Sequence, residues 1–431
     1  MKLRPPGFNP TALQRDWTML ASTIGERRAG TVAERRAADY IAARFAAAGT
    51  APPGIEEFPC QSLRAARATV QERRGRVWRN VAARPLVGAP GTPGVVRGEI
   101  AWLELPENAP RLRPGSLRGK VAAVFGPLPT SAPMHRALLA AAPLAVIHVD
   151  DRLPFPWTKN DGVYPHWVHR HGMPPTLTVP YTEAWRWRRD GVRELRVDVH
   201  VDLRAATSQN VIAEIPGRDS ALPPLVLTAH HDTQCGNPGA DDNASGVVCL
   251  LALARALAGT SLRRTVRCIS FGTEEQLSVG SAAYVARHRR ESARAGLVIN
   301  FDSVASPLGH WEMYVAGHPG LTRYTQRRLA AGGLDVAVKP EIIPFSDHFP
   351  FNRAGAPSLW FMRTNFPGGR WQHHSHHDTL ENVSAAEVLK LLQAVYPLIT
   401  DLAQRSRWPF PGGLPAAQAT TVRRLGRELF G

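Results

Sequence analysis

The chain has 431 residues, of which 44% are hydrophobic and 20% are charged, a composition that fits a globular protein and argues against extensive disorder. Its formal net charge of +16 first suggests a nucleic-acid partner, because clustered Lys and Arg neutralise phosphates. Nearly all of this charge is arginine scattered through the chain, and no nucleic-acid-binding motif accompanies it, so we expect no nucleic-acid partner.

The sequence shows no mark of export or of membrane insertion. Its first residues lack the uninterrupted apolar segment of a secretory signal, and no stretch is long enough to span a bilayer. The four cysteines form no CxxC pair and match neither a disulfide framework nor a structural zinc site. We therefore expect a cytoplasmic protein with no membrane partner, and export is the alternative.

The predicted elements change in character along the chain. Residues 11–49 predict an amphipathic helix, because apolar side chains recur on one helical face before Gly49. From residue 93 to 201, short apolar runs alternate with Pro-rich loops, which predicts a smaller β-rich domain inserted into the chain.

The remainder of the chain predicts an α/β fold. Residues 202–431 alternate apolar strands with helices, a pattern typical of a sheet covered by helices. A chain of this length also exceeds what one compact core usually holds. We therefore predict that residues 1–92 and 202–431 form the main domain and residues 93–201 the inserted one.

Polar residues with metal-binding chemistry follow the first of these strands. His230 and Asp232 end the apolar run 225–229, and the two-residue period of a strand points both to the same side. One of them can bind a metal ion while the other orients it, since ligating histidines often donate their second ring N–H to a carboxylate. A structural histidine is the alternative for this triplet alone.

The next segment places two carboxylates directly before an apolar helix. Asp241 and Asp242 stand in the run Pro-Gly-Ala-Asp-Asp-Asn-Ala-Ser-Gly, residues 238–246. A helix cap would explain one of them but does not need both. Together with His-x-Asp, this run resembles the co-catalytic zinc aminopeptidases, a family that also includes glutamate carboxypeptidase. The resemblance implies that Asp242 bridges two metal ions.

Later strand ends match the same family pattern. The strand 266–271 leads to Glu274 and Glu275, which the resemblance identifies as the general base and a metal ligand. The apolar strand 297–301 ends in Asp302, at the place of another ligand. The last ligand is His374, because residues 374–379 fit the pattern His-Ser/Thr-x-x-Asp-Thr.

The resemblance therefore implies a two-zinc site and a zinc-dependent exopeptidase fold, with a mixed central sheet flanked by helices. One Zn²⁺ set consists of His230, Asp242 and Asp302, and the other consists of Asp242, Glu275 and His374. Ligands of oxygen and imidazole without thiolate suit a catalytic zinc ion or a similar divalent ion. Glu274 and Asp232 are the predicted catalytic residues, and a peptide is the predicted substrate. The inserted domain is similar to a protease-associated domain.

Three features leave room for variation. The family usually has x-Gly-Leu-x-Gly-Ser after Glu275, whereas residues 276–281 here read Gln-Leu-Ser-Val-Gly-Ser, which predicts a differently shaped loop. Asp347 and His348 resemble pocket residues of the family. His373, His376 and His377 crowd His374 and are expected to be surface or pocket residues. His166, His169 and His171 in the inserted domain either form a polar loop packed on the main domain or, as alternatives, contact substrate or bind an extra metal ion.

The predicted activity is that of an aminopeptidase. A carboxypeptidase and a glutaminyl cyclase are alternatives on the same fold, and a peptide-binding relative without turnover is a third. The last is disfavoured because neither Glu274 nor any expected ligand is missing. The sequence contains no pattern that predicts the preferred residue, the peptide length or the oligomeric state.

Overall fold

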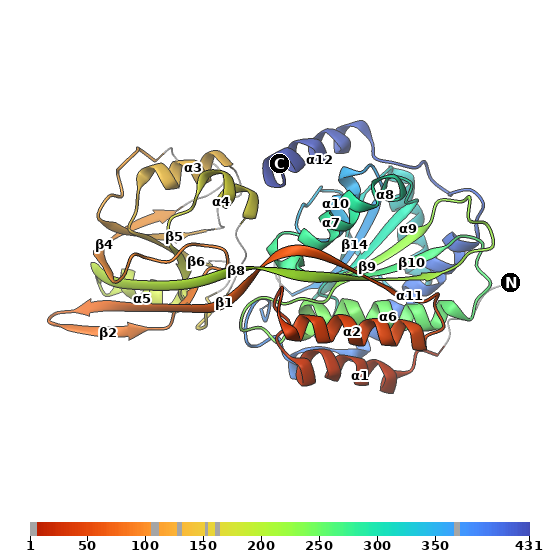
Figure 1. Ribbon diagram of the computed structural model, residues 1–431, viewed down its shortest axis with the longest axis horizontal. Coiled ribbons are helices and arrows are strands. Elements are labelled where there is room, and N and C mark those ends of the chain that lie inside the picture. Colours follow the sequence, from red (N-terminus) through yellow and green to blue (C-terminus); the bar gives the residue numbers. More distant parts are fainter. Residues whose placement is uncertain (1–6, 105–111, 127–131, 151–153, 160–163, 366–370) are drawn as a thin grey trace. The chain divides into compact units, whose positions relative to one another are not determined.

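The computed structural model describes residues 7–104, 112–126, 132–150, 154–159, 164–365 and 371–431. The chain divides into two compact units, one made of residues 1–60 and 206–426 and the other of residues 61–205 and 427–431 (Figure 1). Among the described residues, no helix is long and apolar enough to cross a bilayer.

The first unit is built on a mixed sheet whose strand order is β13-β12-β14-β11-β9-β10-β8. The central strands β9, β10, β11 and β14 run parallel, whereas β8 and β12 are antiparallel to their neighbours β10 and β14. The bounds of these strands are β8 Glu194–Ile215, β9 Leu225–His230, β10 Val266–Phe271, β11 Leu297–Phe301, β12 His310–Ala316, β13 Ala337–Lys339 and β14 Ser358–Thr364.

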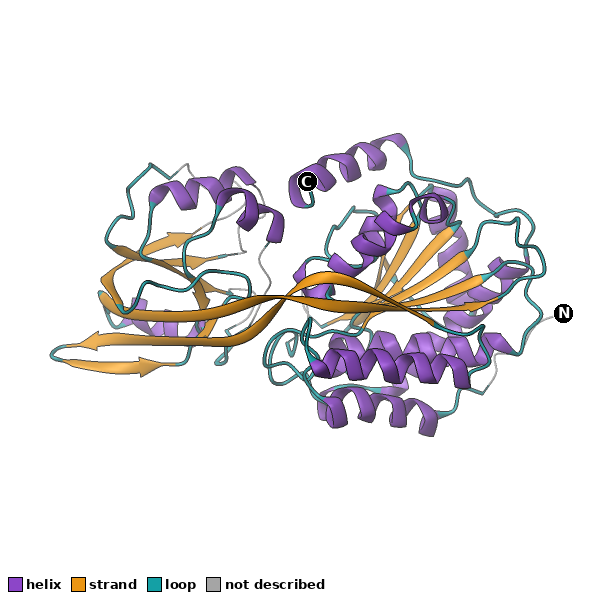
Figure 2. Cartoon of the chain, viewed as in Figure 1, coloured by secondary structure: helices purple, strands orange, loops and turns teal. Residues whose placement is uncertain are grey.

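Helices cover both faces of this sheet (Figure 2). The helical segments of the unit are α1 Pro10–Thr18, η1 Met19–Ile24, α2 Val32–Ala47, η2 Ala240–Ser245, α6 Gly246–Ala258, η3 Glu274–Gln276, α7 Val279–Arg287, α8 Arg289–Ala293, α9 Pro319–Ala331, α10 His348–Arg353, η4 Leu380–Asn382, α11 Ala385–Gln404 and α12 Ala416–Leu429, whose last residues belong to the second unit. This arrangement confirms the predicted α/β class with a mixed central sheet.

The strands show why two helical layers are needed. Every residue of β9 and β11 is buried, which is the pattern of central parallel strands covered on both faces. Leu225 and Leu227 pack in the core that includes α1, α2, α6, α9 and α11, whereas Val226 between them packs against Tyr284 of α7 and Phe351 of α10. The alternation follows from the two-residue period of a strand.

The strand order continues from β8 into the second unit as β4-β5-β6-β7-β3, and strands β4 to β7 run parallel there. Its elements are β1 Gly54–Arg74, β2 Val77–Val81, β3 Arg84–Pro85, β4 Val96–Glu104, β5 Lys120–Phe125, β6 Ala145–Val149, β7 Thr176–Thr178, α3 Ala132–Ala141, α4 Pro165–His171 and α5 Tyr181–Arg189. Trp187 of α5 and Leu138 of α3 pack in two different apolar clusters that both include residues of β5 and β6. The unit is therefore itself α/β and not purely β-rich.

The boundaries of the second unit differ from the predicted range 93–201. The unit begins at residue 61, because β1 and β2 form an antiparallel hairpin and bury Val70 and Val81 in the same core as β5 and β6. At the other end, β8 continues through residue 201: its first part pairs with β4 and its last part with β10. The predicted limit at Val201 thus falls within a continuous strand. The resemblance of this unit to a protease-associated domain stays a prediction.

Candidate metal centre

The first group of ligand atoms gathers around His230, the last residue of β9. Its Nε2 atom lies 3.2 Å from Asp242 Oδ1 and 3.6 Å from Asp302 Oδ1. One ligand atom from each of the three buried residues lies within 4.8 Å of the others. His230 Nε2 is buried and has no hydrogen-bond partner among the described residues. A buried nitrogen lone pair that faces two carboxylates without a hydrogen bond fits a metal ligand.

The second group meets the first at Asp242. Its Oδ2 atom lies 3.2 Å from His373 Nε2 and 3.4 Å from His374 Nε2, and His374 Nε2 is also 3.1 Å from Glu275 Oε2. The two imidazole rings stack with their centroids 3.5 Å apart. The structure therefore brings together all five residues that the sequence predicts as ligands, and adds His373.

Sequence reasoning selected His374 and not His373 because of the spacing of His374 to Asp378, and consecutive side chains in an extended chain would point to opposite sides. His374 instead has a φ of 56°, in the left-handed region that few residues other than glycine adopt. This turn of the backbone is the reason that both imidazoles reach Asp242. A run of two adjacent histidines was the signal in the sequence that could have raised this possibility.

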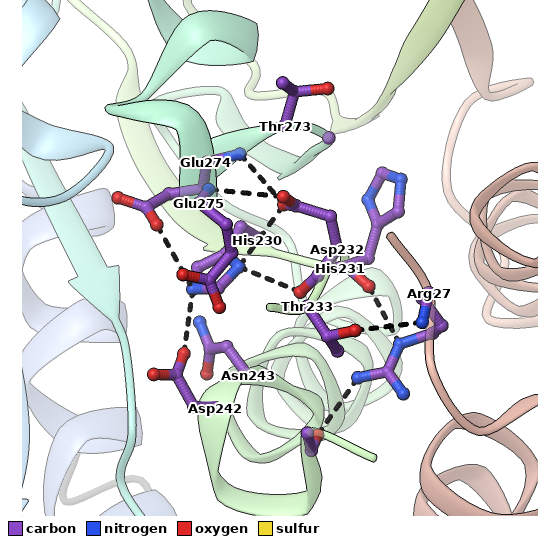
Figure 3. Close-up of polar contacts among 12 residues, drawn as sticks. Arg27, His230, His231, Asp232, Thr233, Asp242, Asn243, Thr273, Glu274 and Glu275 are labelled. Atoms are coloured by element: carbon purple, nitrogen blue, oxygen red, sulfur yellow. Dashed lines mark hydrogen bonds and ion pairs between the residues drawn. The ribbon is translucent and has the colours of Figure 1, made fainter. Parts of the chain in front are cut away.

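Asp232 contacts both His230 and the two glutamates (Figure 3). One of its carboxylate oxygens lies 3.4 Å from His230 Nδ1. The same carboxylate accepts the backbone N–H groups of Glu274 at 2.9 Å and Glu275 at 3.2 Å. Asp232 is thus placed against the imidazole and also bonds the turn that follows β10.

The turn that carries the two glutamates has an unusual backbone. Thr273 has a φ of 55°, an outlier for a β-branched residue. It directs Glu274 and Glu275 to different partners: Glu275 Oε1 accepts the N–H of Gln234 at 3.1 Å, whereas Glu274 Oε2 lies 3.8 Å from His230 Nε2. The two adjacent carboxylates therefore occupy different places in the site, consistent with different roles.

Further buried groups hold the loops in place. Asp378 accepts the backbone N–H groups of Asp241 at 2.6 Å and Asp242 at 2.9 Å, and Ser346 donates its hydroxyl to Asp302 Oδ2 at 2.6 Å. The predicted pocket residues Asp347 and His348 are buried at the start of α10.

Arg27 makes the most extensive set of contacts around the site that sequence reasoning missed. Its side chain is fully buried and donates to five backbone carbonyl groups: those of Leu20, Gly25, His231, Pro238 and Gly239. Its backbone N–H donates to the hydroxyl of Thr233. These bonds join the amino-terminal segment to both ends of the loop 231–239, which lies between His230 and Asp242 (Figure 3). No local pattern in the sequence reveals contacts over 200 positions.

The electrostatics of the site favour a bound cation. Burial raises the pKa of Glu274 well above its usual range, and Asp347, Asp302 and Glu275 add to the rise although His230 opposes it. Burial also raises the pKa of Glu275 and raises that of Asp347 to about 7. Several carboxylates this close cannot all ionise unless positive charge compensates them. Oxygen and imidazole donors without thiolate suit a divalent ion such as zinc.

The histidines predicted as possible extra ligands in the second unit lie on or at the end of α4. Among the described residues, the clusters of three or more possible ligands are the two that share Asp242, and neither includes His166, His169 or His171. The described residues therefore give no support to an extra metal site at these three histidines.

A mixed α/β sheet at whose strand ends imidazoles and carboxylates meet forms a candidate site for metal ions. The model of peptidase family M28 matches residues 210–399. These residues contain the whole cluster from His230 to His374.

Individual relatives agree with this family. Over 215 residues, 47% of this chain and 46% of the relative, the sequence is 27% identical to Aminopeptidase YwaD of Bacillus subtilis. Over 157 residues, 35% of each protein, it is 34% identical to Leupeptin-inactivating enzyme 1 of Streptomyces exfoliatus. The matched part thus spans less than half the length of either relative.

Two solved structures share the fold. A zinc aminopeptidase from Bacillus subtilis superposes with a TM-score of 0.72 at 22% identity, covering 94% of this chain and 98% of that one. A peptidase M28 precursor from Shewanella amazonensis superposes with a TM-score of 0.75 at 18% identity, covering 94% and 97%.

Proposed function

We propose that the protein is a zinc-dependent aminopeptidase that releases amino-terminal residues from peptides. The observation that carries the proposal is the convergence of His230, Asp242 and Asp302, with one ligand atom from each within 4.8 Å of the others. The names of the relatives support the reaction: the Bacillus subtilis protein is an aminopeptidase, and one similar structure is of a zinc aminopeptidase.

Two zinc ions fit the proposed site. His230, Asp242 and Asp302 would hold one, and Asp242, Glu275 and His374 would hold the other. Zinc bound at such a site lowers the pKa of a water toward about 7 and polarises the carbonyl group of the scissile bond.

Glu274 is the proposed general base. It accepts a proton from the attacking water as the water oxygen bonds to the carbonyl carbon, and it passes that proton to the leaving amine as the C–N bond breaks. Asp232 fixes the backbone of Glu274 and the ring of His230, and so keeps both in place without reacting itself. A carboxylate beside both the water and the leaving amine can hold the proton between the two steps.

A substrate panel tests the direction of cleavage. Peptides with a free amino end and an amidated carboxyl end should be cut one residue at a time from the amino end, and the same peptides with an acetylated amino end should resist. Cleavage of the acetylated peptides from a free carboxyl end would replace the proposal with a carboxypeptidase. Formation of pyroglutamate from amino-terminal glutamine without hydrolysis would replace it with a cyclase.

A further inference from the structure

Ser278 occupies the position before the first turn of α7, where a serine usually caps the helix by accepting a backbone N–H. Its side chain makes no such capping bond. The hydroxyl instead donates to Glu274 Oε1 at 3.2 Å. Ser278 is fully buried, so water does not compete for this hydroxyl.

The backbone around Ser278 is strained, because several of its residues have a positive φ. Ser278 has a φ of 55°, Leu277 one of 68° and Thr273 one of 55°, all in the left-handed region. The turn is closed by the N–H of Ser278, which donates to the carbonyl of Glu274 at 2.7 Å, and by that of Val279, which donates to Thr273 at 3.1 Å. Strain of this kind persists where the surrounding structure holds it, often at functional sites.

The consequence falls on the carboxylate of Glu274. With Oε1 held by Ser278, the other oxygen, Oε2, is the one that faces His230 Nε2 at 3.8 Å. A glutamate side chain has several rotatable bonds, and reactions lose rate steeply when a reacting group is misplaced. Leucine stands at the place of Ser278 in the family pattern, and leucine has no donor.

We propose that Ser278 is a positioning residue for Glu274: its hydroxyl fixes one carboxylate oxygen and thereby aims the other at the metal-binding residues. The proposal rests on the proposed function, in which Glu274 is the general base. Ser278 itself does not touch the reacting atoms.

Replacement of the hydroxyl is the first test. Ser278→Ala should lower kcat by roughly 10- to 100-fold with KM changed less than about twofold, because substrate binding does not depend on the aim of Glu274. Zinc content measured by elemental analysis should stay at the wild-type value. Ser358→Ala is the matched control, since Ser358 is also buried in the first unit but is bonded to Asn352, and its kcat should be unchanged.

Ser278→Gly separates the hydroxyl from the backbone. Glycine adopts a φ of 55° without strain, so this variant keeps the turn while it lacks the donor. It should be as slow as Ser278→Ala. Wild-type kcat in either variant, or loss of zinc from Ser278→Gly, would overturn the proposal.

A double-mutant cycle gives the decisive result. In a Glu274→Gln background no base remains to be aimed, so adding Ser278→Ala should reduce the residual kcat by less than about twofold. A further 10-fold loss would mean that Ser278 acts independently of Glu274, and the inference would be wrong. Near-normal turnover of Glu274→Gln alone would instead refute the proposed general base, so the two failures are distinguishable.

Discussion

Two adjacent carboxylates, Glu274 and Glu275, differ in the atoms that they face. Glu275 lies against His374 and the N–H of Gln234, whereas Glu274 faces His230 and receives the Ser278 hydroxyl. The proposed roles of ligand and base follow from these surroundings and not from the residue type, which is the same at both positions.

Glutamine substitutions test this pair. Glu274→Gln keeps size and polarity but removes the base, so turnover should fall by roughly 10²–10⁴-fold while zinc content stays constant. Glu275→Gln weakens a ligand, so zinc content should fall together with activity. Elemental analysis beside steady-state kinetics reads out both. Loss of zinc from Glu274→Gln but not from Glu275→Gln would reverse the assignment.

The two stacked histidines give a second prediction at the residue scale. His374 Nε2 lies 3.4 Å from Asp242 Oδ2 and 3.1 Å from Glu275 Oε2, and His373 Nε2 lies 3.2 Å from Asp242 Oδ2. We therefore expect His374→Ala to lower the affinity for zinc by more than about 100-fold and His373→Ala to lower it far less. Competition with a chelator measures both, with the exposed His376→Ala as control. Equal losses would make His373 a ligand as well.

At the scale of elements, Arg27 shows how a distant segment supports the site. Lysine carries three donors where arginine carries five in a planar fork. Arg27→Lys should therefore leave buried carbonyls of the loop 231–239 without partners and lower the free energy of unfolding by about 3 kcal/mol. It should also weaken zinc binding.

Urea denaturation and chelator competition measure these two effects of Arg27→Lys. Arg28→Lys is the matched control, since Arg28 is partly exposed and paired with Glu26. Its free energy of unfolding should change by less than about 1 kcal/mol. If Arg27→Lys bound zinc with wild-type affinity, the loop 231–239 would keep its shape without the hydrogen bonds of Arg27.

The second unit has a buried ion cluster of its own. Glu72 on β1 is fully buried and accepts hydrogen bonds from both Nη atoms of Arg186, at 2.8 and 2.5 Å, and from Arg74 at 2.8 Å. Burial raises the pKa of Glu72, but the arginines outweigh it and hold the pKa at about 2. The hairpin of β1 and β2 is tied to α5 by this carboxylate.

The sign of the pH dependence follows from that lowered pKa. The ionised Glu72 contributes stability above its ordinary value of 4.5, and this contribution is lost as the pH falls toward about 2. Glu72→Gln should thus be less stable than the wild type at pH 6, with the difference shrinking between about pH 4.5 and 2. Urea titrations at several pH values check this, with the exposed Glu99→Gln as control. A difference independent of pH would contradict the role of the charge.

At the scale of the whole molecule, metal binding and folding are linked. A metal that binds the folded chain alone adds about 4 kcal/mol to its stability at a thousandfold excess over Kd. Chelation should therefore abolish peptidase activity and lower Tm, and added zinc should restore both. Full activity of protein shown to be metal-free by elemental analysis would refute a metal-dependent mechanism.

The fold class could be predicted from the sequence because its signals are local. Buried parallel strands appear as continuous apolar runs that lead into polar residues: His230 at the end of β9, Asp302 after β11 and the glutamates after β10. Carboxyl ends of parallel strands meet at one edge of a sheet. The structure brings those residues together, and their individual roles stay predictions.

Only the tertiary structure decided which other groups support the cluster and where the second unit begins. Arg27 contacts loops more than 200 positions away, Ser278 turns from its helix to Glu274, and His373 reaches Asp242 through the left-handed backbone of His374. From residue 61 onward, the β1–β2 hairpin belongs to the second unit, where Val70 and Val81 pack against residues of other strands. A periodic pattern records which face of an element is apolar, but packing alone determines what that face meets.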